Sequence, residues 1–198
     1  MFSLEDLLGQ QQGNEAVNQI SQTLGANPTV TNAAIQMALP MILSGLANNA
    51  QQPQGADALA NTLEKNHDGS VLDNLGGFLG NGNQISDDGI GILGHIFGNR
   101  QGAVAHQVSE KSGLDIGQVA QLLITLAPIV MGFLGKKKQE QNLDAGGLSN
   151  MLGEQQQQMQ TAGNPMMDMV SGFFDKDKDG SSMDDLASMA ASYFQQKR

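Results

Sequence analysis

The chain has 198 residues, of which 20 are acidic and 10 basic, so its formal net charge is −10. This charge argues against nucleic-acid binding, because lysine and arginine side chains supply most of the affinity for a phosphate backbone. The sequence contains no cysteine, which excludes disulfides, thiolate metal sites and cysteine nucleophiles. The length suits one domain or two small ones.

Neither the first residues nor the apolar stretches are typical of a secreted or membrane-spanning protein. Residues 1–9 (MFSLEDLLG) lack a basic segment, a continuous apolar stretch and a small-residue cleavage site, so they do not form a secretory signal. They predict a short amphipathic helix with Ser3 as its N-cap. The longest apolar stretch, residues 119–135, is shorter than the ~20 residues that cross a bilayer. We therefore expect a cytoplasmic protein with a buried core helix here.

Hydrophobic periodicity along the chain is helical, and no stretch shows sustained alternation with a period of two. β-Branched and aromatic residues are sparse, which also disfavours a sheet. The sequence therefore predicts an all-α fold. The expected helices cover residues 14–25, 29–50, 55–65, 71–80, 88–98, 101–112, 116–137, 144–153, 164–174 and 182–196.

An internal duplication emerges when the chain is compared with itself at an offset of about 88 residues. Three aligned pairs have matching expected roles. Gly25 and Gly113 each end a helix, Asn27 and Asp115 each cap one, and Pro40 and Pro128 each kink one. Each proline removes one backbone hydrogen bond and should kink its apolar helix. We expect a duplicated helical bundle in which the two kinked helices pack together at the centre, related by a pseudo-twofold axis.

Four segments follow from this comparison. They are a first helical repeat over residues 1–87, a second over 88–153, a Gln-rich linker over 154–164, and a C-terminal helix–acidic loop–helix over 165–198. The linker assignment depends on the polar, low-complexity run of glutamines at 155–158.

The C-terminal acidic loop resembles the opening of an EF-hand calcium loop. Aspartates stand at loop positions 1, 3 and 5, a glycine follows at position 6, and a backbone carbonyl is available at position 7. Leu186 at position 12 replaces the usual glutamate, so an aspartate at position 10 or 11 would have to close the site. The expected calcium ligands are Asp175, Asp177, Asp179, Ser181, Asp184 and Asp185.

Helix capping is the alternative interpretation of this loop. Ser181 and Asp184 fit a capping box, although that leaves Asp175 and Asp177 without a role. A related turn over residues 64–74 carries less charge, and there we expect capping rather than calcium.

Two further patterns point to packing rather than to chemistry. Residues 89–94 (GIGILG) match a dinucleotide-binding string, but the preceding residues predict a loop instead of a strand. We expect a close-packing helix that begins near residue 88, with Ser86 or Asp87 as its cap. The histidines, His67, His95 and His106, show no metal-ligand spacing and no carboxylate beside them on a helix face, and His95 is expected in the core or at its boundary.

Several strings resemble a bacterial family, the domain of unknown function 937, in its YidB-like, Bacteroidetes-type form. They are residues 38–46 (ALPMILSGL), 67–77 (HDGSVLDNLGG), 91–98 (GILGHIFG) and 127–136 (APIVMGFLGK). The resemblance implies a small helical bacterial protein with a duplicated core, and it transfers no catalytic residue.

These observations favour a non-enzymatic binding, assembly or scaffolding protein that binds calcium through residues 175–185. We expect a protein partner or self-association, because helices rich in glycine and alanine allow close packing between subunits. A membrane-peripheral protein that uses the two apolar helices is the alternative. A third interpretation is an enzyme, but the lack of any nucleophile–base motif argues against it.

Overall fold

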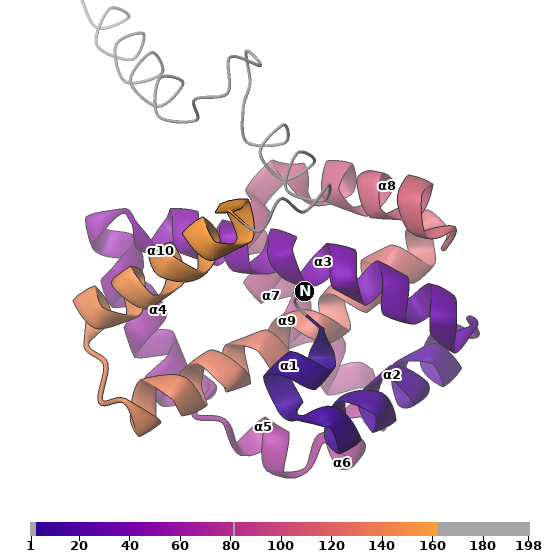
Figure 1. The fold of residues 1–198 in the computed structure, drawn as a ribbon, viewed down its shortest axis with the longest axis horizontal. Coiled ribbons are helices and arrows are strands. Elements are labelled where there is room, and N and C mark those ends of the chain that lie inside the picture. Colours follow the sequence, from indigo (N-terminus) through magenta and orange to yellow (C-terminus); the bar gives the residue numbers. More distant parts are fainter. Residues whose placement is uncertain (1–2, 81, 162–198) are drawn as a thin grey trace, which may run out of the picture. The chain divides into compact units, whose positions relative to one another are not determined.

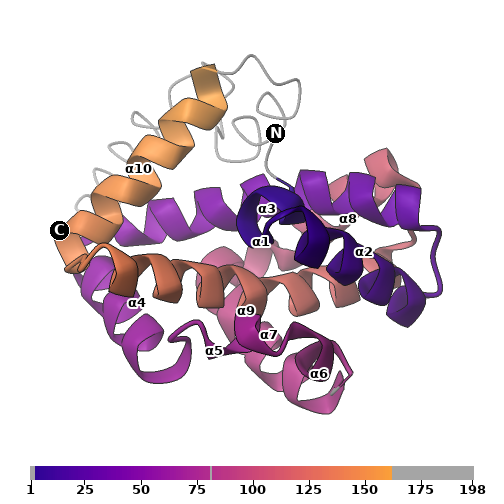
Figure 2. The same ribbon diagram turned by 60° about the horizontal axis from the view of Figure 1, so that its bottom comes forward.

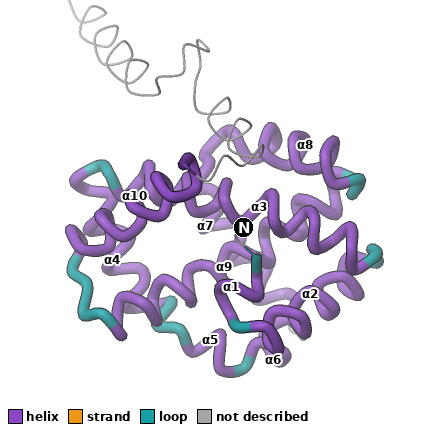
Figure 3. The backbone as a smooth tube through the Cα atoms, in the orientation of Figure 1, coloured by secondary structure: helices purple, strands orange, loops and turns teal. Residues whose placement is uncertain are grey.

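Helices form nearly all of the chain that the structure describes. The computed structural model describes residues 3–80 and 82–161, and within these ranges it contains helices and loops but no strand (Figure 3). The predicted all-α fold is therefore confirmed. The helices are α1 (Leu4–Leu8), α2 (Gln10–Leu24), α3 (Pro28–Ala50), α4 (Pro53–Asn66), α5 (Ser70–Asp73), α6 (Leu75–Leu79), α7 (Gly82–Phe97), the 3-10 helix η1 (Gly98–Arg100), α8 (Gln101–Ser112), α9 (Ile116–Glu140) and α10 (Ala145–Thr161).

A compact unit ends at Gln156, and a second unit begins at Gln157. The predicted helix–acidic loop–helix segment, residues 165–198, lies outside the described residues. The fold described below is that of the first unit.

The turns that lead into the two longest helices, α3 and α9, have the same local structure. Asn27 caps α3 and Asp115 caps α9, each accepting a hydrogen bond of 2.8 Å from a first-turn backbone N–H. Gly25 ends α2 and Gly113 ends α8 in the left-handed conformation, at φ 62° and 83°, which glycine adopts without strain. These are the pairs that the sequence offset aligns. The duplication itself stays a prediction.

Helices α3 and α9 form the core of the first unit. They lie side by side and run in the same direction (Figures 1 and 2). Pro40 lies inside α3 and Pro128 inside α9, and both are buried. Both helices are long and apolar enough to span a membrane, a test that buried core helices also pass. In this structure 72% of the most apolar stretch of α3 and 61% of that of α9 are buried.

Helix α7 packs closely on the core because glycines remove side chains from the contact. Gly89 of α7 lies against the backbone carbonyl of Ile124 in α9, where a Cβ atom would overlap it. Gly45 of α3 likewise lies against the side chain of Ile96 in α7. Within the glycine-rich string of α7, Gly89 therefore serves the close helix packing that we expected.

Two predicted helix boundaries between residues 71 and 98 were wrong. Helix α7 begins at Gly82 and not near residue 88, so Ser86 and Asp87 lie within it and neither caps it. The polar composition of residues 82–87 indicates a loop only weakly, since local propensity is readily overridden by tertiary packing. The single helix expected over 71–80 is interrupted at Asn74, whose side chain accepts a hydrogen bond of 3.2 Å from the N–H of Gly77 and caps α6.

Helix α10 continues through the glutamine run to Thr161, so residues 154–161 of the expected linker are helical. Glutamine is a good helix former, and one of these side chains is anchored to the core helix. Gln156 donates to Asn48 Oδ1 at 3.2 Å and accepts from Gln51 Nε2 at 3.3 Å. Leu148 and Leu152 of α10, one turn apart, are fully buried.

Candidate functional site

The predicted calcium ligands lie outside the described residues. They are Asp175, Asp177, Asp179, Ser181, Asp184 and Asp185. Within the described part of the chain, no group of three or more histidine, aspartate or glutamate side chains could hold a metal ion. The calcium site is therefore still a prediction.

The related turn over residues 64–74 is described, and its carboxylates have separate protein partners. Glu64 accepts a hydrogen bond of 3.3 Å from Lys138 Nζ in α9. Asp68 Oδ1 accepts one of 3.0 Å from the N–H of Ser70, and this hydrogen bonding lowers the pKa of the Asp68 carboxyl group. Asp68 therefore caps the turn that leads into α5, which is the role we expected.

A pocket of about 450 Å³ lies between α4 and α7. Its size falls within the range of small-molecule sites, which are roughly 300–1,000 Å³. Helix α3 and helix α9 contribute to its floor. The apolar side chains that line it are Leu46, Ala58, Leu59, Ile92, Ile96 and Met131.

Glycine contacts position the two helices that border the pocket. Gly55 holds the first turn of α4 against the carbonyl of Asn49 at the end of α3, since a Cβ atom at Gly55 would overlap it. Helix α7 is held by the contacts at Gly45 and Gly89 described above. Gly91 lines the pocket, and no atom lies within 4 Å of the position of its absent Cβ. Each helix is thus fixed on the core while the space between them stays open.

His67 and Asp88 face each other across this space. His67 follows α4, its imidazole is only 7% exposed, and its Nε2 atom lies 3.6 Å from Asp88 Oδ1 of α7. Burial lowers the pKa of His67 below its ordinary value of 6.5, and this effect outweighs the opposing effect of the Asp88 and Asp68 carboxylates. Burial therefore favours the neutral form of the His67 imidazole.

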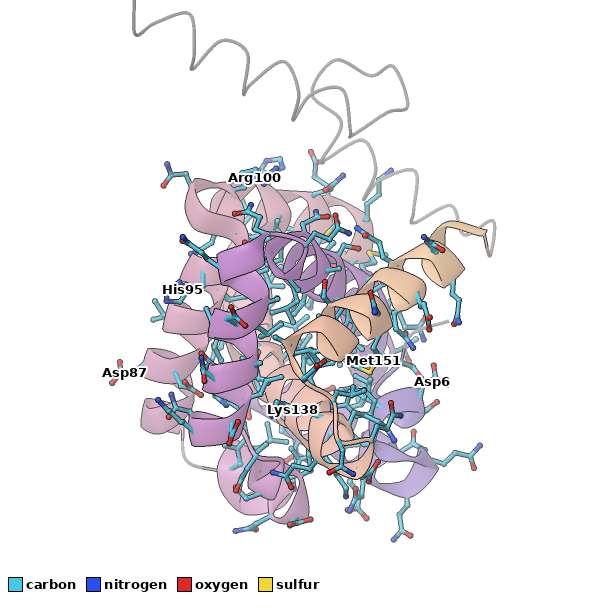
Figure 4. The ribbon with its side chains drawn as sticks, turned by 90° about the vertical axis from the view of Figure 1, so that its left-hand side faces the viewer. Asp6, Asp87, His95, Arg100, Lys138 and Met151 are labelled. Carbon is cyan, nitrogen blue, oxygen red and sulfur yellow. The ribbon has the colours of Figure 1, made fainter. Side chains whose placement is uncertain are left out.

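The outer rim of the pocket carries Asp87 and His95 of α7. Figure 4 faces the α4 side of the molecule and shows both side chains projecting outward on the same side of α7. His95 is exposed, so its expected place in or near the core was wrong. A carboxylate also lies beside a histidine on one helix face, contrary to expectation, since His106 is 3.6 Å from Glu110 in α8.

Two side chains in the pocket wall, Asn49 and Thr62, already donate their hydrogen bonds to backbone carbonyls. The Asn49 side-chain N–H group donates to the carbonyl oxygens of His95, at 2.9 Å, and Ile96, at 3.4 Å. The Thr62 hydroxyl donates to the carbonyl of Ala58 at 2.8 Å. What these two side chains can offer a ligand is therefore an acceptor oxygen.

The sequence had indicated neither the pocket nor the approach of His67 to Asp88. His67 follows α4 and Asp88 lies in α7, and the two are not linked by a spaced motif. The only sequence signal was the clustering of polar residues around 66–68 and 87–88, which turns and helix caps explain equally well.

Residues 6–137 of the chain match a protein family described as "Bacterial protein of unknown function (DUF937)". All residues that line the pocket fall within this range. No curated protein and no solved structure matches the sequence.

Proposed function

This chain belongs to the DUF937 family of bacterial proteins of unknown function, and we propose that it is a non-enzymatic binding protein. Its ligand site is the pocket between α4 and α7. One observation carries the proposal, namely a pocket of about 450 Å³ that is lined by six apolar and seven polar side chains. That combination is typical of small-molecule sites.

The groups around His67 support binding rather than catalysis. A general base needs a nucleophile within hydrogen-bond reach, about 2.6–3.2 Å. Thr62 is the hydroxyl residue among the described side chains that line the pocket, and its hydroxyl donates to Ala58 within its own helix. His67 instead faces the Asp88 carboxylate at 3.6 Å.

The proposal is tested by filling the pocket from within. Gly91→Leu places a side chain in the cavity, where no atom stands within 4 Å of the new Cβ. Gly102→Leu is the matched control, because Gly102 is an exposed helical glycine in α8 with equally open surroundings. Binding of n-hexanol, a neutral probe for the apolar floor, is followed by amide chemical-shift changes in two-dimensional NMR spectra.

We expect saturable shifts at pocket residues in the wild type and the Gly102→Leu variant, and their loss in Gly91→Leu. Both variants must keep the far-ultraviolet circular dichroism spectrum of the wild type. Shifts that persist in folded Gly91→Leu protein would refute the assignment of the pocket as the binding site.

We also propose, from the sequence, that residues 175–185 bind calcium. Three aspartates at alternate positions followed by glycine support this. The binding of a protein partner or of a second copy is a further proposal. Membrane association is the alternative, supported by the length and apolar character of α3 and α9.

A further inference from the structure

We infer that the ligand of the pocket is a primary aliphatic amine, whose ammonium group lies at the Asp87–Asp88 rim and whose carbon chain lies on the apolar floor. This inference rests on the proposed function, because it names the ligand class of the same pocket. Charge, hydrogen-bonding capacity and the chemistry of the floor support it separately.

The charge at the pocket is negative and has no built-in counterion. Asp87 and Asp88 are consecutive residues of α7 that both line the pocket. Among the described lining residues there is no lysine or arginine. Two histidines also line the pocket, with His95 at its outer rim. His67 lies 3.6 Å from Asp88, and its burial lowers its pKa and so favours the neutral imidazole. A cationic ligand would supply the missing positive charge.

Four side chains of the pocket, those of Asn49, Thr62, Asp87 and Asp88, present acceptor oxygens to a ligand that only donates. Asn49 and Thr62 already donate hydrogen bonds to backbone carbonyls, so they present acceptor oxygens to a ligand. The aspartates are acceptors as well. The imidazole of His67 is only 7% exposed, and in its neutral form one ring nitrogen is a further acceptor while the other carries an N–H donor. An ammonium group carries three N–H donors and no acceptor.

The floor favours an aliphatic chain and disfavours a quaternary ammonium group. Its side chains are leucine, isoleucine and methionine, and no aromatic residue is among the described lining residues. Quaternary ammonium ions are recognised by aromatic cages, which this pocket lacks in its described part. Primary amines instead use charge-assisted hydrogen bonds to carboxylates.

The experiment compares three probes that share one carbon chain, n-hexylammonium, n-hexanol and hexanoate. Their binding to the full chain is measured at pH 7.5 by titration in NMR spectra. We expect n-hexylammonium to bind at least about tenfold more tightly than n-hexanol, since each charge-assisted hydrogen bond is about twice as strong as a neutral one. Hexanoate should bind more weakly than both.

One variant and its control test whether the preference for n-hexylammonium over n-hexanol depends on the rim of the pocket. Asp88→Asn should bring the affinities of n-hexylammonium and n-hexanol to within about threefold of each other while leaving n-hexanol binding unchanged. Asp57→Asn is the control, because Asp57 is an exposed aspartate of α4 that does not line the pocket. It makes the same charge change and should keep the wild-type preference.

The outcomes separate this inference from the proposed function. Equal binding of n-hexylammonium and n-hexanol that is lost in Gly91→Leu would retain the pocket as a binding site and overturn the amine inference. An ammonium preference that survives Asp88→Asn, or tighter binding of hexanoate, would also overturn it. No saturable binding of any probe at millimolar concentration, or binding unaffected by Gly91→Leu, would overturn both.

Discussion

Two glycines of α7, two residues apart, should respond in opposite directions to the same substitution. Gly91→Ala adds a methyl group where no atom lies within 4 Å, whereas Gly89→Ala adds one against the backbone of α9. Both changes remove a glycine from a helix interior. The comparison therefore isolates the contact between α7 and α9.

The magnitudes follow from helix propensity and overpacking. Replacing glycine by alanine inside a helix stabilises by about 0.5–1 kcal/mol, and Gly91→Ala should gain that amount. At Gly89 the new Cβ would lie 2.8 Å from the carbonyl carbon of Ile124, although ordinary contact begins at about 3.4 Å. Overpacking of this kind costs about 1–3 kcal/mol. With the middle of each range, the propensity gain leaves a net destabilisation of about 1 kcal/mol for Gly89→Ala.

Urea unfolding followed by circular dichroism at 222 nm measures both changes. Because α7 stays helical in each variant, the slope of the unfolding free energy against urea should be unchanged, and the midpoints should move in opposite directions. If Gly89→Ala stabilised the protein as much as Gly91→Ala, then α7 would not approach α9 at Gly89. The placement of α7, and with it the pocket, would then be wrong.

Two other predictions concern titration and calcium. Since the pKa of folded His67 lies below 6.5, the unfolded state binds more protons just below that pH, so the free energy of unfolding should decrease as the pH falls from 7 to 5. This decrease in the free energy of unfolding should be smaller in His67→Gln, by about 1.4 kcal/mol for each unit by which the His67 pKa is shifted. The lowered pKa of Asp68 does not contribute in this range, because it changes the stability only below its ordinary value of 3.8. Equal pH profiles of urea unfolding for the two proteins would contradict this. Calorimetric titration of metal-stripped protein should show saturable calcium binding that Asp175→Asn/Asp177→Asn abolishes, and identical heats in both proteins would reduce the loop to a helix cap.

The parts of the fold that were predictable depend on local chemistry. Asn27 followed by Pro28 marks the start of α3, and Gly113 marks the end of α8, because cap geometry and left-handed glycines act within one turn of the chain. Ser3 caps α1 as expected, with its hydroxyl accepting from the N–H of Asp6 at 3.2 Å. The family resemblance was likewise carried by contiguous strings and is confirmed over residues 6–137. The narrower YidB-like, Bacteroidetes-type assignment stays a prediction.

The errors arose where a residue type is compatible with two local states. The polar residues 82–87 suit a loop or the exposed face of a helix, and the glutamines at 155–158 suit a linker or a helix. Contacts with other helices decide between them. Gln156, for example, hydrogen bonds to Asn48 of α3, which is distant in sequence. Such contacts leave no periodic signal in the segment itself.

The sequence by itself determined that the chain is helical, where its long apolar helices start, and that α7 carries glycines suited to close packing. These properties depend on hydrogen bonds and periodicities within a few residues. Only the tertiary structure decided that α4 and α7 rest on α3 and α9 with a pocket between them, and that His67 faces Asp88 at 3.6 Å. A cavity is the space left by the packing of distant helices, and the pKa of a histidine depends on the burial that this packing creates.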